Sequence, residues 1–103
     1  MHIAHPLLAE RQIYKITGTA KVISFRQQDP AVVTKITPTL VFLHGFNGNS
    51  ASWRYQFSHF QTCRVLSIDA PGFGETSILE GGMAGFAEVV IQMLYDLGLK
   101  SFW

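Results

Sequence analysis

TLVFLHGFNGNSASW, residues 39–53, is the stretch of this sequence that decides the fold. It opens with LVFL (40–43), a short run that is apolar on both faces and is bounded by turn-forming residues. Such a run is typical of a strand covered on both sides, as in a parallel sheet. Two glycines and small polar residues then bend the backbone, and Asn49 or Ser50 is suited to cap a following helix. We expect that helix over residues 51–60.

Three aromatic residues give the predicted helix its core-facing side. Trp53, Phe57 and Phe60 follow one another at spacings of four and three, which places them on one face of an α-helix. After this helix, CRVLSI (63–68) predicts a second buried strand, and DAPGFGETS (69–77) predicts a loop. Strand, helix and strand in this order are typical of a parallel α/β fold with right-handed crossovers.

The rest of the chain extends this pattern in both directions. From Met83, apolar residues recur at helical spacing as far as Gly98, a candidate helix C-cap, and SFW from Ser101 starts another apolar run. Near the N-terminus, residues 15–22 alternate polar and apolar side chains, and Gly18 allows either one strand with a bulge or a hairpin. The predicted core face of the helix consists of Met83, Phe86, Ala87, Val90, Met93, Leu94 and Leu97.

Composition and charge exclude several classes of function. With 103 residues the chain holds one small domain at most, and 48% hydrophobic residues argue against disorder. Eight basic and seven acidic residues leave a net charge of +1 without a basic patch, so nucleic acid is not an expected partner. No run approaches the ~18 apolar residues of a membrane span, so we expect no membrane partner. Residues 1–12 lack the features of a signal peptide, and the single cysteine, Cys63, fits a reducing compartment, so the expected location is cytoplasmic.

The residues that could carry chemistry gather in two loops. The loop HGFNGN (44–49) follows the first buried strand, and the loop 69–77 follows the second. Both therefore start at carboxyl ends of strands, where open α/β sheets bind their ligands. A loop that leads into a helix also presents unpaired backbone N–H groups, which can hold an anion. These two loops are the expected site.

The spacing of residues in these loops resembles that of the α/β-hydrolase superfamily. His44-Gly45 is followed by Trp53 nine residues after the histidine, and then by the motif Asp69-x-x-Gly72-x-Gly74-x-Thr76. The resemblance spans residues 13–103, with residues 1–12 as an N-terminal extension. It implies an α/β fold that forms the N-terminal part of an α/β-hydrolase sheet, in which an antiparallel strand or hairpin precedes parallel strands with two helices.

The resemblance also implies roles for individual residues. In this family the His-Gly loop supplies a backbone N–H to the oxyanion hole, and in this chain the donor would be the N–H of Phe46. Gly45 and Asn47 would lie beside it in contact with substrate. The other motif residues would be structural support: His44, Asp69, Gly72 and Gly74.

Other parts of the family's catalytic machinery do not occur in this sequence. The nucleophile elbow G-x-S-x-G is absent, because Gly48-Asn-Ser50-Ala-Ser52 lacks the final glycine and Ser50 is better explained as a helix cap. In the family the catalytic acid and histidine follow the nucleophile. All four histidines of this chain precede the position of the elbow: His2, His5, His44 and His59. We therefore expect the 103-residue chain alone to be inactive.

Several of these residues have a purely structural explanation. His44 is better explained as a histidine that holds the two loops together by hydrogen bonds than as a proton carrier, and Asp69 as a loop cap than as a general base. His2 and His5 have the spacing of a metal pair but no further ligands nearby. Cys63 begins a predicted buried strand, so its thiol is expected to be unreactive. No nucleotide-binding fingerprint is complete, and we expect neither a metal nor a cofactor.

Two hypotheses about function remain open. In the first, the chain is part of a hydrolase that acts on an ester, a lactone or a C–C bond of a small carbonyl substrate, and its nucleophile lies in sequence beyond Trp103. Asn47 stands where epoxide- and haloalkane-type members commonly have proline, which disfavours those substrates.

In the second, the 103 residues are a truncated, non-catalytic product that binds a small ligand or a partner. The LVFL strand should pair with the strand from Ser101, so a chain that ends there exposes an apolar edge. Such an edge favours self-association, and the isolated chain is expected to be marginally stable.

Overall fold

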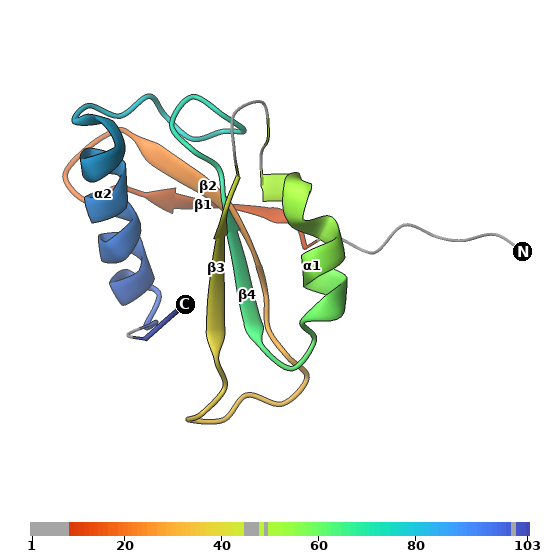
Figure 1. The fold of residues 1–103 in the computed structure, drawn as a ribbon. Coiled ribbons are helices and arrows are strands. Elements are labelled where there is room, and N and C mark those ends of the chain that lie inside the picture. Colours follow the sequence, from red (N-terminus) through yellow and green to blue (C-terminus); the bar gives the residue numbers. More distant parts are fainter. Residues whose placement is uncertain (1–8, 45–47, 49, 100) are drawn as a thin grey trace, which may run out of the picture.

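The fold is built around a four-stranded mixed sheet in the order β1-β2-β4-β3 (Figure 1). The computed structural model describes residues 9–44, 48, 50–99 and 101–103. Its strands are β1 (Arg11–Lys15), β2 (Val22–Gln28), β3 (Thr39–Leu43) and β4 (Arg64–Ile68). β2 pairs with β4 antiparallel, whereas β3 pairs with β4 parallel. This arrangement confirms the predicted architecture, in which an antiparallel hairpin precedes parallel strands with two helices.

The first two strands form an antiparallel hairpin in which Lys15 lies opposite Val22. The chain turns between them, where the Thr19 N–H donates to the Ile16 carbonyl at 3.1 Å and Gly18 has a φ of 77°. Glycine adopts such a left-handed backbone without steric cost. Of the two alternatives predicted for residues 15–22, one bulged strand or a hairpin, the structure contains the hairpin. Only the ends of that alternating segment belong to strands, because most of it forms the turn.

The connection from β3 to β4 contains the predicted helix in two parts. A 3₁₀ turn, η1 (Ser50–Trp53), comes first, and the α-helix proper is only α1 (Arg54–His59). The predicted helix over 51–60 is therefore present as a 3₁₀ turn followed by a shorter α-helix. Of its two predicted caps, Asn49 lies outside the described residues, and Ser50 is the first residue of the 3₁₀ turn. Trp53 is the N-cap of α1 and makes no side-chain cap bond. 3₁₀ turns are common where α-helices begin, and this one lets the Trp53 ring stack on Phe42 with 4.8 Å between centroids.

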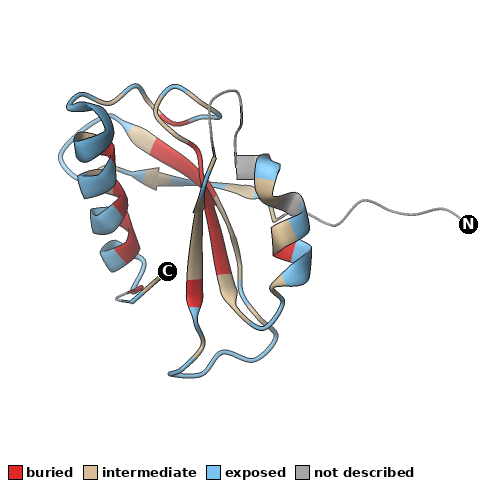
Figure 2. Cartoon of the chain, in the orientation of Figure 1, coloured by how far each residue is buried: buried red, intermediate tan, exposed pale blue. Residues whose placement is uncertain are grey.

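The helix α2 (Gly82–Asp96) covers the opposite face of the sheet from α1 (Figure 1). Figure 2 shows its buried side turned toward the strands. Each large apolar side chain buried there contributes ~1.5–3 kcal/mol. Gly98 follows the helix with a φ of 82°, as expected of a C-cap glycine. The core under α2 joins Phe86, Val90, Met93 and Leu94 to Ile23, Phe25, Leu66 and Ile68.

Three residues of the predicted core face of α2 are exposed instead. Met83 is 77% exposed and Leu97 is 38% exposed, while Ala87 also faces outward. The sheet is too narrow to cover the full apolar stripe of this helix. No helix among the residues that the structure describes is long and apolar enough to cross a membrane.

The last residue of the chain lies against β3. The Trp103 N–H donates to the Thr39 carbonyl at 2.8 Å, and the Val41 N–H donates to the Trp103 carbonyl at 2.7 Å. Trp103 thus bonds to the two residues that flank Leu40, and such bonding of one residue to both flanks of its partner is typical of parallel strands. The prediction that LVFL pairs with the stretch from Ser101 is thus confirmed.

Candidate active-site loops

The two predicted loops begin side by side at one end of the sheet. Leu43 and Ile68 are partners in the parallel ladder, so His44 and Asp69 leave neighbouring strands at the same edge. Ligands of open α/β sheets bind at such an edge, outside the carboxyl ends of the strands. The site residues predicted on these loops are therefore brought together as far as the structure describes them.

His44 connects the two loops directly. Its Nε2 accepts a hydrogen bond from the Ala70 N–H at 2.9 Å, and its ring meets Phe73 edge-on with 5.1 Å between centroids. A ring nitrogen that accepts an N–H carries no proton of its own. In this arrangement Nε2 of His44 is engaged in structure and does not deliver a proton.

Asp69 is fully buried under the second loop and holds a network of polar contacts. The Ser24 hydroxyl donates to Asp69 Oδ2 at 2.5 Å, and Arg11 Nε donates to the same oxygen at 3.2 Å. The backbone N–H of Asp69 donates to the Ser24 carbonyl at 3.0 Å. A buried carboxylate needs such partners, because without them its desolvation costs several kcal/mol. These contacts orient Asp69 toward the interior.

The far end of the same loop is hydrogen-bonded to β2. The Thr76 hydroxyl donates to the Asp69 carbonyl at 2.8 Å and accepts from the Ser24 N–H at 2.9 Å. One residue on, the Ser77 N–H donates to the Val22 carbonyl at 2.9 Å, and the Val22 N–H donates to the Ser77 hydroxyl at 3.0 Å. The loop is thus fixed at both ends.

Sequence reasoning missed two members of this network, Ser24 and Arg11. A signal for Ser24 was present, because it is a polar residue between two apolar ones, Ile23 and Phe25, in a strand. A buried hydroxyl in that position needs a partner. Nothing in the sequence marked Arg11, which lies far from Asp69 along the chain.

Both motif glycines have left-handed backbones, with φ of 83° at Gly72 and 53° at Gly74. They differ in the space around them. A Cβ on Gly72 would meet only Ile78, at ordinary contact distance, whereas a Cβ on Gly74 would collide with the Asp69 carboxylate. Gly74 therefore makes room for the buried acid as well as shaping the turn.

The residues proposed to contact substrate cannot be placed in the same way. Phe46, Gly45 and Asn47 lie outside the described residues. Farther along, at the end of the 3₁₀ turn, Trp53 has a buried Nε1 that bonds to none of the described residues. Among the described residues, no three His, Cys, Asp or Glu side chains lie close enough together to hold a metal ion.

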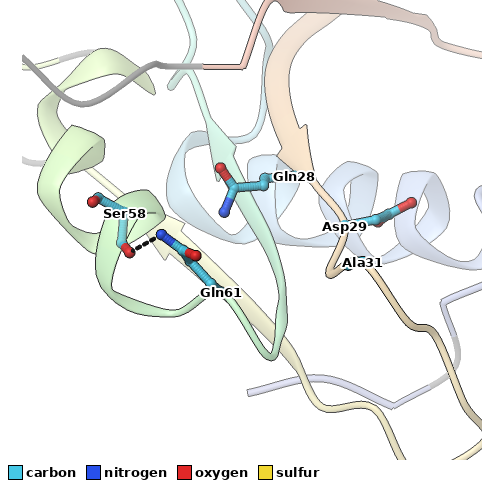
Figure 3. Close-up of a pocket in the computed structure, with 5 residues that line it drawn as sticks. All are labelled: Gln28, Asp29, Ala31, Ser58 and Gln61. Atoms are coloured by element: carbon cyan, nitrogen blue, oxygen red, sulfur yellow. Dashed lines mark hydrogen bonds between the residues drawn. The ribbon is translucent and has the colours of Figure 1, made fainter.

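A pocket of about 330 Å³ lies away from these loops (Figure 3). It lies beyond Gln28, the last residue of β2, and its lining is polar. The Gln28 amide donates to the Phe57 carbonyl at 2.7 Å, and the Gln61 amide donates to the Ser58 carbonyl at 2.9 Å. Because these amides already bond to the backbone and Asp29 points away from them (Figure 3), we regard the pocket as structural.

Comparison with known proteins identifies the class to which this fold and these loops belong. The family model for the alpha/beta hydrolase fold matches residues 38–103, more than half of the chain. The chain therefore belongs to the α/β-hydrolase family.

Individual relatives agree with this assignment. The 2-succinyl-6-hydroxy-2,4-cyclohexadiene-1-carboxylate synthase of Salmonella typhi is 39% identical over 70 residues, which are 65% of this chain and 27% of that enzyme. A bromoperoxidase from Bacillus anthracis has a TM-score of 0.68 at 24% identity, covering 86% of this chain and 32% of that one. An epoxide hydrolase from Vigna radiata also has a TM-score of 0.68, at 20% identity, covering 91% and 30%. The chain thus spans about a quarter to a third of the length of these proteins.

Proposed function

We propose that this chain supplies the oxyanion-binding loop of a hydrolase that acts on an ester, a lactone or a C–C bond of a small carbonyl substrate. The backbone N–H of Phe46 is the donor, and Gly45 and Asn47 contact the substrate beside it. The nucleophile, the acid and the catalytic histidine come from sequence other than these 103 residues. A cytoplasmic location fits the single cysteine, Cys63.

The contact that carries this proposal is the bond between His44 and the Ala70 N–H. It ties the loop that precedes Phe46 to the loop that the Asp69 network fixes on β2. An oxyanion hole works because its donors are held in place before charge develops, so no energy is spent on reorganisation during the reaction. A rigid support directly before the donor meets that requirement.

The similarity to the synthase at 39% identity supports a particular substrate class, namely carbonyl compounds that carry carboxylate groups. Its name describes a synthase whose product has a succinyl group and a ring carboxylate. A C–C bond next to a carbonyl is therefore the first reaction to test for this chain, with ester cleavage as the second.

A chimera tests the donor. Residues 38–103 replace the matched segment of the Salmonella typhi synthase, and the chimera is compared with Phe46→Pro and Phe46→Ala versions of itself. Proline removes the backbone N–H, whereas alanine keeps it. We expect Phe46→Pro to lower kcat by about 10²–10³-fold with little change in KM, and Phe46→Ala to stay within a few-fold of the chimera. Equal kcat values for the two variants would contradict the proposal.

The 103-residue chain alone supplies a second test. We expect no turnover of p-nitrophenyl esters and no labelling by a fluorophosphonate probe, because the chain has no nucleophile elbow. Saturable turnover or stoichiometric labelling would mean that a nucleophile is present.

A second candidate function is association through an exposed apolar face. A groove of about 250 Å³ between β3 and α2 is lined almost entirely by apolar side chains, among them Leu43, Met83 and Ile91. Monomeric proteins rarely leave large contiguous patches of this kind uncovered. We propose a second copy of the chain as its occupant when the 103 residues are on their own.

A further inference from the structure

A smaller pocket, of about 230 Å³, lies at the end of the sheet opposite the two loops. It is enclosed by the segment before β3, by the first residue of β4 and by the segment that follows α2. Its volume is several times the ~30 Å³ that one water molecule occupies in the liquid. None of the described residues that line it has a carboxylate side chain. The basic and hydroxyl-bearing side chains that line it are Lys35, Arg64, Thr34, Thr37, Thr39 and Ser101.

Two of these side chains are cationic. Lys35 is exposed and makes no ion pair with any described residue. The Arg64 side chain is 20% exposed, and its Nε donates to Asp29 at 2.9 Å. A guanidinium has five N–H donors, so this bond to Asp29 leaves the terminal nitrogens of Arg64 available.

Thr39 adds a buried hydroxyl. Only 4% of this residue is exposed, yet no described residue accepts from or donates to its side chain. Thr39 Oγ1 is not among the described side-chain atoms that are both fully buried and without a partner, since only Trp53 Nε1 is in that state. The Thr39 hydroxyl therefore keeps a small accessible surface, and Thr39 lines the pocket. A nearly buried hydroxyl without a partner is a position where a ligand atom gains a hydrogen bond.

We propose that this pocket binds a phosphate group. Two cations and several hydroxyls approach it from three separate segments, which suits an anion that accepts hydrogen bonds in several directions. A lysine binds phosphate as a point charge and an arginine adds directed donors. This site is independent of the proposed catalytic loops, because they lie at the other end of the strands.

Two nearby features oppose an anion, and both are weaker than the two cations. The C-terminal end of α2 carries the negative end of the helix dipole, whose effect on an exposed charge is typically 0.3–1 kcal/mol. Three carbonyls of its last turn are already bonded, since the N–H groups of Leu97, Leu99 and Gly98 donate to Met93, Leu94 and Tyr95, respectively. Asp29 is 48% exposed at its side chain, so water screens its charge.

The test is a titration of the ¹⁵N-labelled 103-residue chain with inorganic phosphate, followed by NMR at constant ionic strength. We expect saturable shifts of the Thr37, Gly98 and Ser101 amides. Lys35→Gln should weaken binding at least ~5-fold, and Thr39→Val, which removes only the hydroxyl, ~3–10-fold. The matched control is Lys21→Gln, because it removes the same charge from the exposed hairpin turn and should leave affinity within ~2-fold.

A fourth variant makes the prediction sharper by acting in the opposite direction. Asp29→Asn removes the negative charge from Arg64, so phosphate should bind more tightly than to the unchanged chain. Dispersed amide spectra verify the fold of each variant. Shifts that do not saturate would overturn the proposal, and so would equal effects of Lys35→Gln and Lys21→Gln or weaker binding to the Asp29→Asn variant.

Discussion

At the scale of single residues, a buried polar network lies beneath the loop 69–77. Ser24, Asp69 and Thr76 are all buried and all bonded to one another. Burying polar groups stabilises a protein little by itself, because their bonds to water are lost. Such a network instead makes the structure specific, because all of its hydrogen bonds can form in only one arrangement of the chain. The network thereby fixes the loop that His44 contacts.

Gly74 has no room for a side chain beside this network. Gly74→Ala places a methyl group against the Asp69 carboxylate and adds left-handed backbone strain. Gly18→Ala is the matched control, because Gly18 has a similar backbone and open space around it. We expect Gly18→Ala to cost ~1–2 kcal/mol of unfolding free energy and Gly74→Ala ~1–3 kcal/mol more. Urea unfolding measures both, and equal losses would show that the carboxylate contact is unimportant.

Ser24 and Asp69 should act as a coupled pair. Ser24→Ala removes a donor to a buried carboxylate and should cost ~1–3 kcal/mol, and Asp69→Asn should cost a similar amount. Since each change already breaks the same bond, the double variant should lose less than the two losses added, with ~0.5–3 kcal/mol of coupling. Denaturant unfolding of the four proteins gives this value. Additive losses would mean that the bond contributes nothing.

The sequence predicted one half of this network and not the other. Asp69, Gly72 and Gly74 form a local motif, so their spacing along the chain is itself a signal. Ser24 and Arg11 reach the network from 45 and 58 residues away. Their positions follow from the pairing of β2 with β4, and a single sequence contains no direct record of that pairing.

At the scale of elements, the strands were predicted more accurately than the first helix. LVFL and CRVLSI are short apolar runs between turn residues, and β3 and β4 follow them to within one residue. The first turn of the predicted helix is 3₁₀, and Trp53 at its end stacks on Phe42 of β3, a tertiary contact that helical spacing does not predict. The family resemblance implied the mixed sheet, but the strand order β1-β2-β4-β3 did not follow from hydrophobic periodicity, which does not state which strands are neighbours.

The hairpin and α2 are joined by one hydrogen bond whose effect depends on pH. The Tyr14 hydroxyl donates to the Asp96 carboxylate at 2.5 Å, and this bond, with a smaller effect of burial, raises the pKa of Tyr14. A pKa above that of the unfolded chain means that the stabilisation is fully present below pH ~10 and is lost as the pH rises through the folded value.

We expect an ultraviolet titration of tyrosinate to show one group above the ordinary value, and Asp96→Asn to lower its pKa. Tyr14→Phe assigns the signal, because it removes that group from the titration. At neutral pH, Tyr14→Phe should cost less than ~1 kcal/mol, since the bond is exposed to water. An unchanged tyrosine titration in the Asp96→Asn variant would contradict this assignment.

At the scale of the whole molecule, the groove between β3 and α2 is an exposed apolar surface. Met83, Ile91 and Trp103 line it and are 77%, 46% and 82% exposed. Covering the groove would remove most of the surface of Met83 and Trp103 and about half of that of Ile91 from water, which favours association.

We expect the 103-residue chain to self-associate with rising concentration, as measured by size-exclusion chromatography with light scattering. Ile91→Lys should shift the chain toward monomer, because a charge in the groove is costly to bury. Tyr55→Lys is the control, since Tyr55 is 61% exposed on α1, across the sheet from the groove. A chain that stays monomeric at all concentrations, or equal effects of both changes, would exclude this association.

The attachment of the loop 69–77 to β2 also has a consequence for the order of folding. The hairpin β1–β2 closes over a short turn, whereas Ser24 meets Thr76 only after more than fifty intervening residues have been arranged. Non-local contacts carry a large entropy of chain closure and tend to form late. We therefore expect Ser24→Ala to accelerate unfolding and to leave the refolding rate nearly unchanged in a stopped-flow chevron. The attachment of the loop 69–77 to β2 would then form after the rate-limiting step of folding.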